Sequence, residues 1–177
     1  MMSPPIVDNV ANFNFSTLYQ VLHDVIAELY GQNLGCEESP LDITETITKI
    51  FQLERSLRSW ELTLPPQVNL IDTENIQLEG YTDPVLQRFR IILTLRKLNL
   101  DILLHRPMLI RAMEPYGNSE ETRIPGVSPA MLKMQANALQ TCVQSAESII
   151  SIIHAISTAE SEKRQLLGAW WFSLYYG

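Results

Sequence analysis

The side chains with the most chemical potential gather within one apolar stretch, residues 84–113. His105 follows Asp101 by four residues, and Asp101 follows Lys97 by four, so all three share one side of a helix. In that geometry Asp101 would orient the imidazole and His105 would transfer a proton. No nucleophile or second base accompanies them in the pattern. The sequence therefore contains a group that could transfer a proton, but no other group with which it could catalyse a reaction.

A second feature of the same stretch favours a structural role for His105. Pro107 lacks an N–H, so inside a helix it leaves the carbonyl near Leu103 without its usual partner. His105 and Arg106 are well placed to satisfy backbone groups at such a point. We therefore interpret the run as the polar closure of a kinked scaffold helix, and we predict no catalytic residue and no enzymatic activity.

The same region is rich in basic side chains and holds one acidic residue, Asp101. Such a cluster could contact phosphate groups. No aromatic stacking platform is interleaved with the cluster, and long basic stems commonly cover a helix flank while their heads reach acidic neighbours. Internal salt bridges are the preferred interpretation for these residues: Arg88, Arg90, Arg96, Lys97, Arg106 and Arg111.

The cysteine and histidine content excludes several other kinds of site. The chain has two cysteines, Cys36 and Cys142, and no Cys-x-x-Cys pair, which argues against a disulfide framework and a zinc site. Cys142 and His154 lie twelve residues apart on one expected helix, too far along its axis to act together. No nucleophile-elbow, dinucleotide-binding or P-loop motif is present. We expect no metal or other cofactor in this chain.

Charge and composition indicate a soluble domain. The 177 residues carry a net charge of −7 and 46% hydrophobic residues, enough for a sizeable core. The negative charge should repel nucleic acid and anionic membranes. No segment approaches the roughly 20 apolar residues that a membrane-spanning helix needs, and the first residues lack a secretory signal. We expect a soluble intracellular protein that contacts neither DNA nor membrane by itself.

Apolar spacing and capping residues predict an all-α fold of about five long helices. The expected helices cover about 15–30, a segment that begins at Ser39-Pro40 and ends before Pro65-Pro66, 84–113 with Asp83 as its N-cap, a segment from Ser128-Pro129 to about 158, and 163–177. Residues 64–82 form a connector with apolar anchors such as Val68. Residues 1–13 are expected to be unstructured, and 14–177 to form a single helical domain.

Two of these helices are expected to bury a particular face. In the helix after Pro129 the predicted packing stripe recurs at helical spacing and contains Leu132, Ala136, Leu139, Val143, Ala146, Ile149, Ile150, Ile153 and Ile156. The segment from 163 to 177 is apolar around most of its circumference and rich in aromatic residues, from Trp170 to Tyr176. Such a segment must be buried or remain adhesive, which predicts a protein partner or a homodimer there.

Several phrases of the chain, in their order, resemble the fungal-specific transcription factor domain, the all-helical middle homology region of zinc binuclear-cluster regulators. The most specific phrase lies within LTLRKLNLDILLHRPML at 93–109. Around it come LYGQN at 29–33, Leu53-Glu54 through Leu57, and the segments from Cys142 to Ile153 and from Trp170 to Tyr176. The residues taken as the family signature are Trp60, Pro65, Leu103, Leu104, His105, Arg106 and Pro107.

The resemblance implies a nuclear regulatory domain that supports dimerisation, effector sensing or restraint of an activation domain. The family's DNA-binding module needs six closely spaced cysteines, and this chain has two. The resemblance therefore does not assign a zinc cluster or its DNA contacts to this chain. The chain looks like the later part of the homology region, truncated at both ends, and the resemblance does not say which small-molecule effector it senses.

Three functions remain open at this level. The first is a transcription-regulatory helical domain without its own DNA reader. The second is a helical protein-protein interaction or self-association module, or a non-functional gene fragment. The third is an enzyme or small-molecule binder with a pocket near His105.

Overall fold

The computed structural model describes residues 4–31, 42–72, 76, 83–113, 129–159 and 166, with side chains of the first helix from residue 16 onward. Its elements, in order, are α1 (Pro4–Tyr30), α2 (Ile43–Leu62), the short 3-10 helix η2 (Pro66–Val68), α3 (Pro84–Met113) and α4 (Pro129–Thr158). Within these ranges there is no strand, which confirms the all-α prediction. There are four α-helices rather than about five, and the predicted fifth, 163–177, lies outside the described residues except for Leu166.

Two helix starts differ from the predictions. Helix α1 begins at Pro4 and not near Phe15, so residues 4–13 are helical rather than unstructured. A proline fits the first turn of a helix because its missing N–H has no partner there. Helix α2 begins at Ile43 and not at Ser39-Pro40. Asp42 is its N-cap, because its carboxylate accepts the Thr44 N–H at 3.1 Å.

The other two starts are confirmed. Asp83 caps α3, because its carboxylate Oδ1 accepts the N–H of Val85 at 2.9 Å and that of Leu86 at 3.4 Å. Pro84 is the first helical residue, and Pro129 takes the same position in α4. The capping and proline signals in the sequence therefore predict the first residue of each of these two helices correctly.

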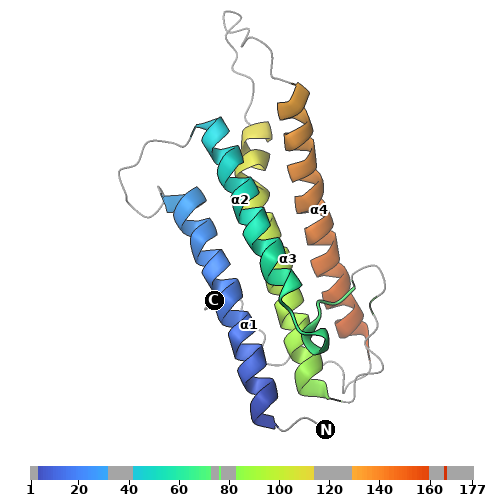
Figure 1. The fold of residues 1–177 in the computed structure, drawn as a ribbon. Coiled ribbons are helices and arrows are strands. Elements are labelled where there is room, and N and C mark those ends of the chain that lie inside the picture. The colour runs from blue at the N-terminus through green and yellow to red at the C-terminus, as the bar shows by residue number, and fades with distance from the viewer. Residues whose placement is uncertain are drawn as a thin grey trace, which may run out of the picture.

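Helix α3 is the element around which the others pack. It contacts α1, α2, α4 and η2, and Figure 1 shows α2 and α4 lying along it on different sides. One buried cluster joins α1, α2 and α3 and reaches α4 at Ala138. A second cluster joins α3 to the end of α4 through Ile91, Leu95, Leu98, Ile152, Ile156 and Leu166. The core is thus divided along the length of α3.

The connector between α2 and α3 is fixed to α3 by polar contacts. The Thr94 hydroxyl accepts the N–H of Ile71 at 2.9 Å and donates to the carbonyl of Arg90 at 2.7 Å. Arg90 Nε donates to the carbonyl of Asn69 at 2.7 Å. Val68 is buried, as predicted for an apolar anchor. These bonds hold the connector against the first half of α3.

Helix α4 buries a different face from the predicted one. Leu132, Leu139, Val143 and Ile150 are exposed, whereas the buried residues are Ala138, Cys142, Ser145, Ile152 and Ile156. Of the predicted stripe, Ile156 is buried and Ile149 packs partly against the second cluster. Both sides of α4 carry apolar residues at helical spacing, so periodicity alone does not choose between them. The small side chains of Ala138, Cys142 and Ser145 let α3 approach closely, and that selects the buried face.

Candidate functional site

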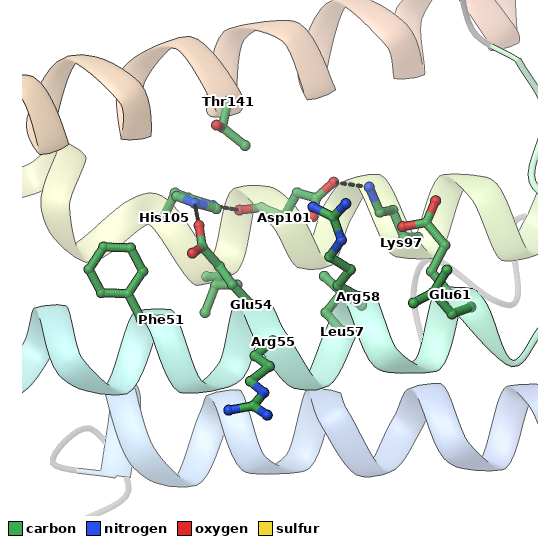
Figure 2. Close-up of a pocket in the computed structure, with 12 residues that line it drawn as sticks. Phe51, Glu54, Arg55, Leu57, Arg58, Glu61, Lys97, Asp101, His105 and Thr141 are labelled. Carbon is green, nitrogen blue, oxygen red and sulfur yellow. Dashed lines mark hydrogen bonds and ion pairs between the residues drawn. The ribbon is translucent and has the colours of Figure 1, made fainter.

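A groove runs between α2 and α4 with α3 as its floor. Its larger part has a volume of about 690 Å³, and a smaller hollow of about 220 Å³ adjoins it and shares Phe51, Glu54 and His105. Figure 2 shows side chains of the larger part rising from α2 and α3, with Thr141 facing them from α4. We name it the α2–α4 groove; its other lining residues are Ile47, Ile50, Arg55, Leu57, Arg58, Glu61, Leu62, Lys97, Asp101, Leu104, Met108, Lys133, Met134, Asn137 and Ala138.

His105 lies in this floor and is 5% exposed. Its Nδ1 is 2.8 Å from the main-chain carbonyl oxygen of Asp101, and its Nε2 is 2.8 Å from Glu54 Oε1 on α2. A carbonyl oxygen and an ionised carboxylate only accept hydrogen bonds, so both ring nitrogens must donate. The arrangement is therefore satisfied by the protonated imidazolium and not by either neutral tautomer.

The electrostatics around His105 agree with that assignment. Burial by itself lowers the pKa of His105, but the hydrogen bonds to Glu54 and to the Asp101 carbonyl, with the negative charges of both carboxylates, outweigh it. The pKa of His105 is thus raised above its ordinary value of 6.5. The His105–Glu54 contact is a charge-assisted bond that links α2 to α3 across the groove floor.

Asp101 plays a different part from the one predicted. Its carboxylate Oδ2 forms an ion pair with Lys97 Nζ at 2.9 Å, as Figure 2 shows, while its main-chain carbonyl holds His105. Burial raises the pKa of Asp101, and the neighbouring Lys97 opposes that shift. The predicted line of Lys97, Asp101 and His105 on one side of α3 is present. The carboxylate that pairs with the imidazole, however, comes from Glu54.

Glu54 is the site residue that the sequence reasoning missed. Its side chain is about one third exposed, at the edge of the groove. The signal was its position, four residues after Ile50 and three before Leu57, both of which are buried. An acidic residue inside the apolar face of a helix points to a polar partner on a neighbouring helix.

The carbonyl freed by Pro107 has a partner, and it is neither of the predicted ones. The Tyr30 hydroxyl on α1 donates to the Leu103 carbonyl at 2.6 Å. Burial raises the pKa of Tyr30 to about 12, while the nearby Arg106 charge opposes the shift. Arg106 itself is exposed. Helix α1 thus supplies the hydrogen bond to the carbonyl that Pro107 leaves free, and this bond joins α1 to the central helix.

The remaining signature residues occupy core and helix-end positions. Trp60 and Leu104 are buried in the first cluster, and Leu103 packs partly against it. The Trp60 carbonyl accepts both the N–H of Thr63 at 2.9 Å and its hydroxyl at 2.6 Å, which ends α2. Pro65 follows and precedes η2. The structure places these residues where they shape the fold around the groove.

Basic side chains of α3 make several kinds of contact within the fold. Lys97 forms the ion pair with Asp101, as the salt-bridge interpretation predicts. Arg90 donates to Asn69, and the Arg96 guanidinium lies 4.9 Å from the centre of the Tyr19 ring on α1. These three cationic groups contribute to interactions within the fold.

The groove lacks a nucleophile and base arrangement among the described residues. Both nitrogens of His105 are occupied, and Thr141 is the one hydroxyl among the described residues that line the groove. The Cys142 thiol lies 3.9 Å from the Ile102 carbonyl, and burial raises its pKa. The described ranges contain no cluster of three or more metal-ligating side chains. Of the helices described, none combines the length and apolar character needed to cross a membrane.

Comparison with known proteins relates the chain to transcription factors. It is 35% identical over 162 residues to Transcription factor FBD3 of Fusarium pseudograminearum, which covers 90% of this chain and 21% of the relative. It is 32% identical over the same shares to Transcription factor FBD3 of Gibberella moniliformis. A third relative, Sorbicillinoid biosynthetic cluster transcription factor 2 of Penicillium rubens, is 31% identical over 128 residues, 71% of this chain and 17% of that protein.

The names of these relatives indicate which class of protein the chain resembles. The chain is related to fungal transcription factors, and the three relatives carry names of regulators and not of enzymes. It spans about a fifth of the length of these curated relatives. No family model matches the chain, and no solved structure matches it.

Proposed function

We propose that this chain is a transcription-regulatory helical domain of the zinc-cluster type, that it acts in the nucleus without enzymatic activity, and that it carries no DNA-binding module or cofactor of its own. The observation that carries the proposal is the similarity along 90% of the chain to Transcription factor FBD3. The all-helical fold around α3 fits such a role. The apolar 163–177 segment, outside the described residues, is proposed as a partner surface.

Within that domain we place the regulatory contacts in the α2–α4 groove. The larger part of the groove has a volume of about 690 Å³, which falls in the range of roughly 300–1,000 Å³ that is common for small-molecule sites. Cations and anions both line it, including Arg58, Lys97 and Glu61. An occupant of the groove would touch α2, α3 and α4 together, and would therefore bias how these helices sit on one another.

The function is tested by joining the full chain between a heterologous DNA-binding domain and an activation domain in a fungal host. We expect reporter transcription to change severalfold relative to the same fusion without the chain. A groove variant, Arg58→Glu, should alter that effect, whereas the exposed α3 variant Ile110→Glu should leave it unchanged. An unchanged reporter in cells that contain the intact nuclear fusion would contradict the proposal.

Direct DNA binding gives an independent test. The purified chain, with its net charge of −7, should not retain duplex DNA at physiological salt. Binding with a steep dependence on salt would mean that the basic residues of α3 contact phosphate, contrary to the proposal. A fluorescence anisotropy titration at two salt concentrations distinguishes these results.

A further inference from the structure

The outer side of α4 carries an apolar stripe that the fold leaves uncovered. Its residues recur at alternating spacings of four and three, which is the heptad pattern of a helix that pairs with another helix. Scattered exposed apolar residues are ordinary, but a continuous row marks an interaction surface. We name this row the α4 seam; it consists of Leu132, Ala136, Leu139, Val143, Ala146, Ile150 and Ile153.

The exposure of the seam is large at its bulky positions. Leu132 is 51% exposed, Leu139 47%, Val143 46% and Ile150 66%. Ala136 is exposed as well, and Ala146 and Ile153 are half-buried. From Leu132 to Ile153 the seam is about 32 Å long at 1.5 Å per residue.

The seam lies on the flank of α4 opposite the α2–α4 groove. Ala138 and Cys142 are buried, whereas the residues just before them, Asn137 and Thr141, line the groove. The residues just after them, Leu139 and Val143, belong to the seam. Because successive helix residues are about 100° apart, the groove and the seam lie on either side of the buried face. A partner on the seam would leave the larger part of the groove open, whereas Lys133, at the seam's edge, also lines the smaller hollow.

Charge along one edge of the seam indicates what the partner is. Lys133, Gln140, Glu147 and His154 recur there every seven residues. Lys133 and Glu147 are both exposed, and neither has an ion-pair partner within the described part of the chain. Lys133 lies near the start of the row and Glu147 lies beyond its midpoint, so this edge is complementary in charge to the same edge of a second, reversed copy.

We propose that two copies of this chain pair through their α4 seams in antiparallel orientation, about a two-fold axis near residue 141. Leu139 then faces Val143 of the second copy, Leu132 faces Ile150, and Ala136 faces Ala146, since each pair is centred on residue 141. Lys133 then lies beside Glu147 of the second copy, and the symmetry provides that ion pair twice. A parallel pair would place no cation at the level of Glu147.

The self-pairing is tested with the full chain by sedimentation velocity between about 1 and 200 µM. We expect a reversible dimer with a dissociation constant on the order of tens of micromolar, because the seam is short and contains two alanines. The double variant Val143→Glu/Ile150→Glu should raise that constant at least tenfold. A chain that stays monomeric over this range overturns the proposal.

Matched variants separate the seam from other surfaces. Ile110→Glu changes a residue of α3 that is 46% exposed, as Val143 is, and should leave the dimer intact. Circular dichroism should give the same melting temperature for the seam variant as for the parent chain at a monomeric concentration, because the substituted residues are exposed. A dimer that survives the seam variant overturns the proposal, since another surface such as 163–177 would then hold the copies together.

The antiparallel orientation has its own test. Lys133→Glu should weaken the dimer severalfold, because it brings like charges together at both ends. Lys133→Glu/Glu147→Lys should restore the parent dissociation constant within about twofold. Failure of the double variant to restore it contradicts the antiparallel orientation.

Discussion

Both sides of α3 bury apolar side chains, and polar links between helices distinguish one side from the other. Toward α1 and α2, α3 shares a buried apolar cluster and also forms two directional polar links: His105 with Glu54, and the Tyr30 hydroxyl with the Leu103 carbonyl. Toward the end of α4, buried side chains such as Ile152 and Ile156 pack against Ile91 and Leu95. Apolar burial supplies more stability, whereas polar links between buried groups fix which rotation and register the helices adopt. The first side should respond to pH, and the second should not.

The largest effect should come from the apolar side. Ile152→Ala removes part of a side chain that is 0% exposed, and should lower the free energy of unfolding by about 2–5 kcal/mol through lost burial and the cavity left behind. Urea unfolding at pH 6 and pH 8 should give the same loss at both.

Ile150→Ala is the matched control, since that residue lies two positions away and is largely exposed. Its cost should stay within about 0.5 kcal/mol for the monomer. Equal costs at Ile150 and Ile152 would contradict the assigned rotation of α4.

The next largest effect should come from the polar side, where Glu54→Gln removes the carboxylate that binds His105. The amide no longer offers a carboxylate to His105, so we expect a loss of about 1–3 kcal/mol at pH 6, reduced because Glu54 is one third exposed. Glu45→Gln provides the control, because Glu45 is exposed and pairs with Lys49 at one helical turn on the surface of α2. That variant should cost less than about 0.5 kcal/mol.

The pH dependence follows from the raised pKa of His105. Its contribution is fully present below about pH 6, where the unfolded chain is protonated too, and is lost as pH rises through the folded pKa above 6.5. The charged groups that line the groove around His105 are Glu54, Arg55, Arg58 and Glu61 from α2, Lys97 and Asp101 from α3, and Lys133 from α4.

Asp101 acts in the same sense. Burial raises its pKa, so its neutral form is favoured on folding and stability again falls as pH rises. Measured from pH 5 to pH 8.5, the free energy of unfolding should decrease. Glu54→Gln should flatten the part of the curve above pH 6, and an unchanged curve in that variant would show that His105 does not cause it.

The smallest effect should come from the tyrosine link. Tyr30→Phe leaves the Leu103 carbonyl without a donor and should cost about 1 kcal/mol. Pro107→Ala restores the N–H that reaches this carbonyl in a regular helix. The cost of Tyr30→Phe should therefore shrink in the Pro107→Ala background, and a cost unchanged by that background would contradict the role of Tyr30.

The sequence predicts contacts within four residues well and contacts between helices poorly. Asp83 capping and the Lys97–Asp101 pair depend on local spacing, and both are present. The partners of His105 and of the Leu103 carbonyl lie 51 and 73 residues away, and they depend on how each helix is rotated about its axis. The rotation of α4 about its axis likewise decides which of its two apolar sides is buried. The small residues Ala138, Cys142 and Ser145 mark the buried side, but both sides show helical periodicity, so the periodic pattern alone did not identify it.

A protonated His105 bound between the Asp101 carbonyl and Glu54 is the central feature of the fold's polar side, and one measurement tests it most directly. The two ring nitrogens of His105, observed by nitrogen NMR in the intact chain, should both carry protons at pH 6.5 and lose one only at higher pH. In Glu54→Gln the same transition should move to lower pH. A neutral His105 ring at pH 6.5 that titrates identically in both proteins would contradict the account.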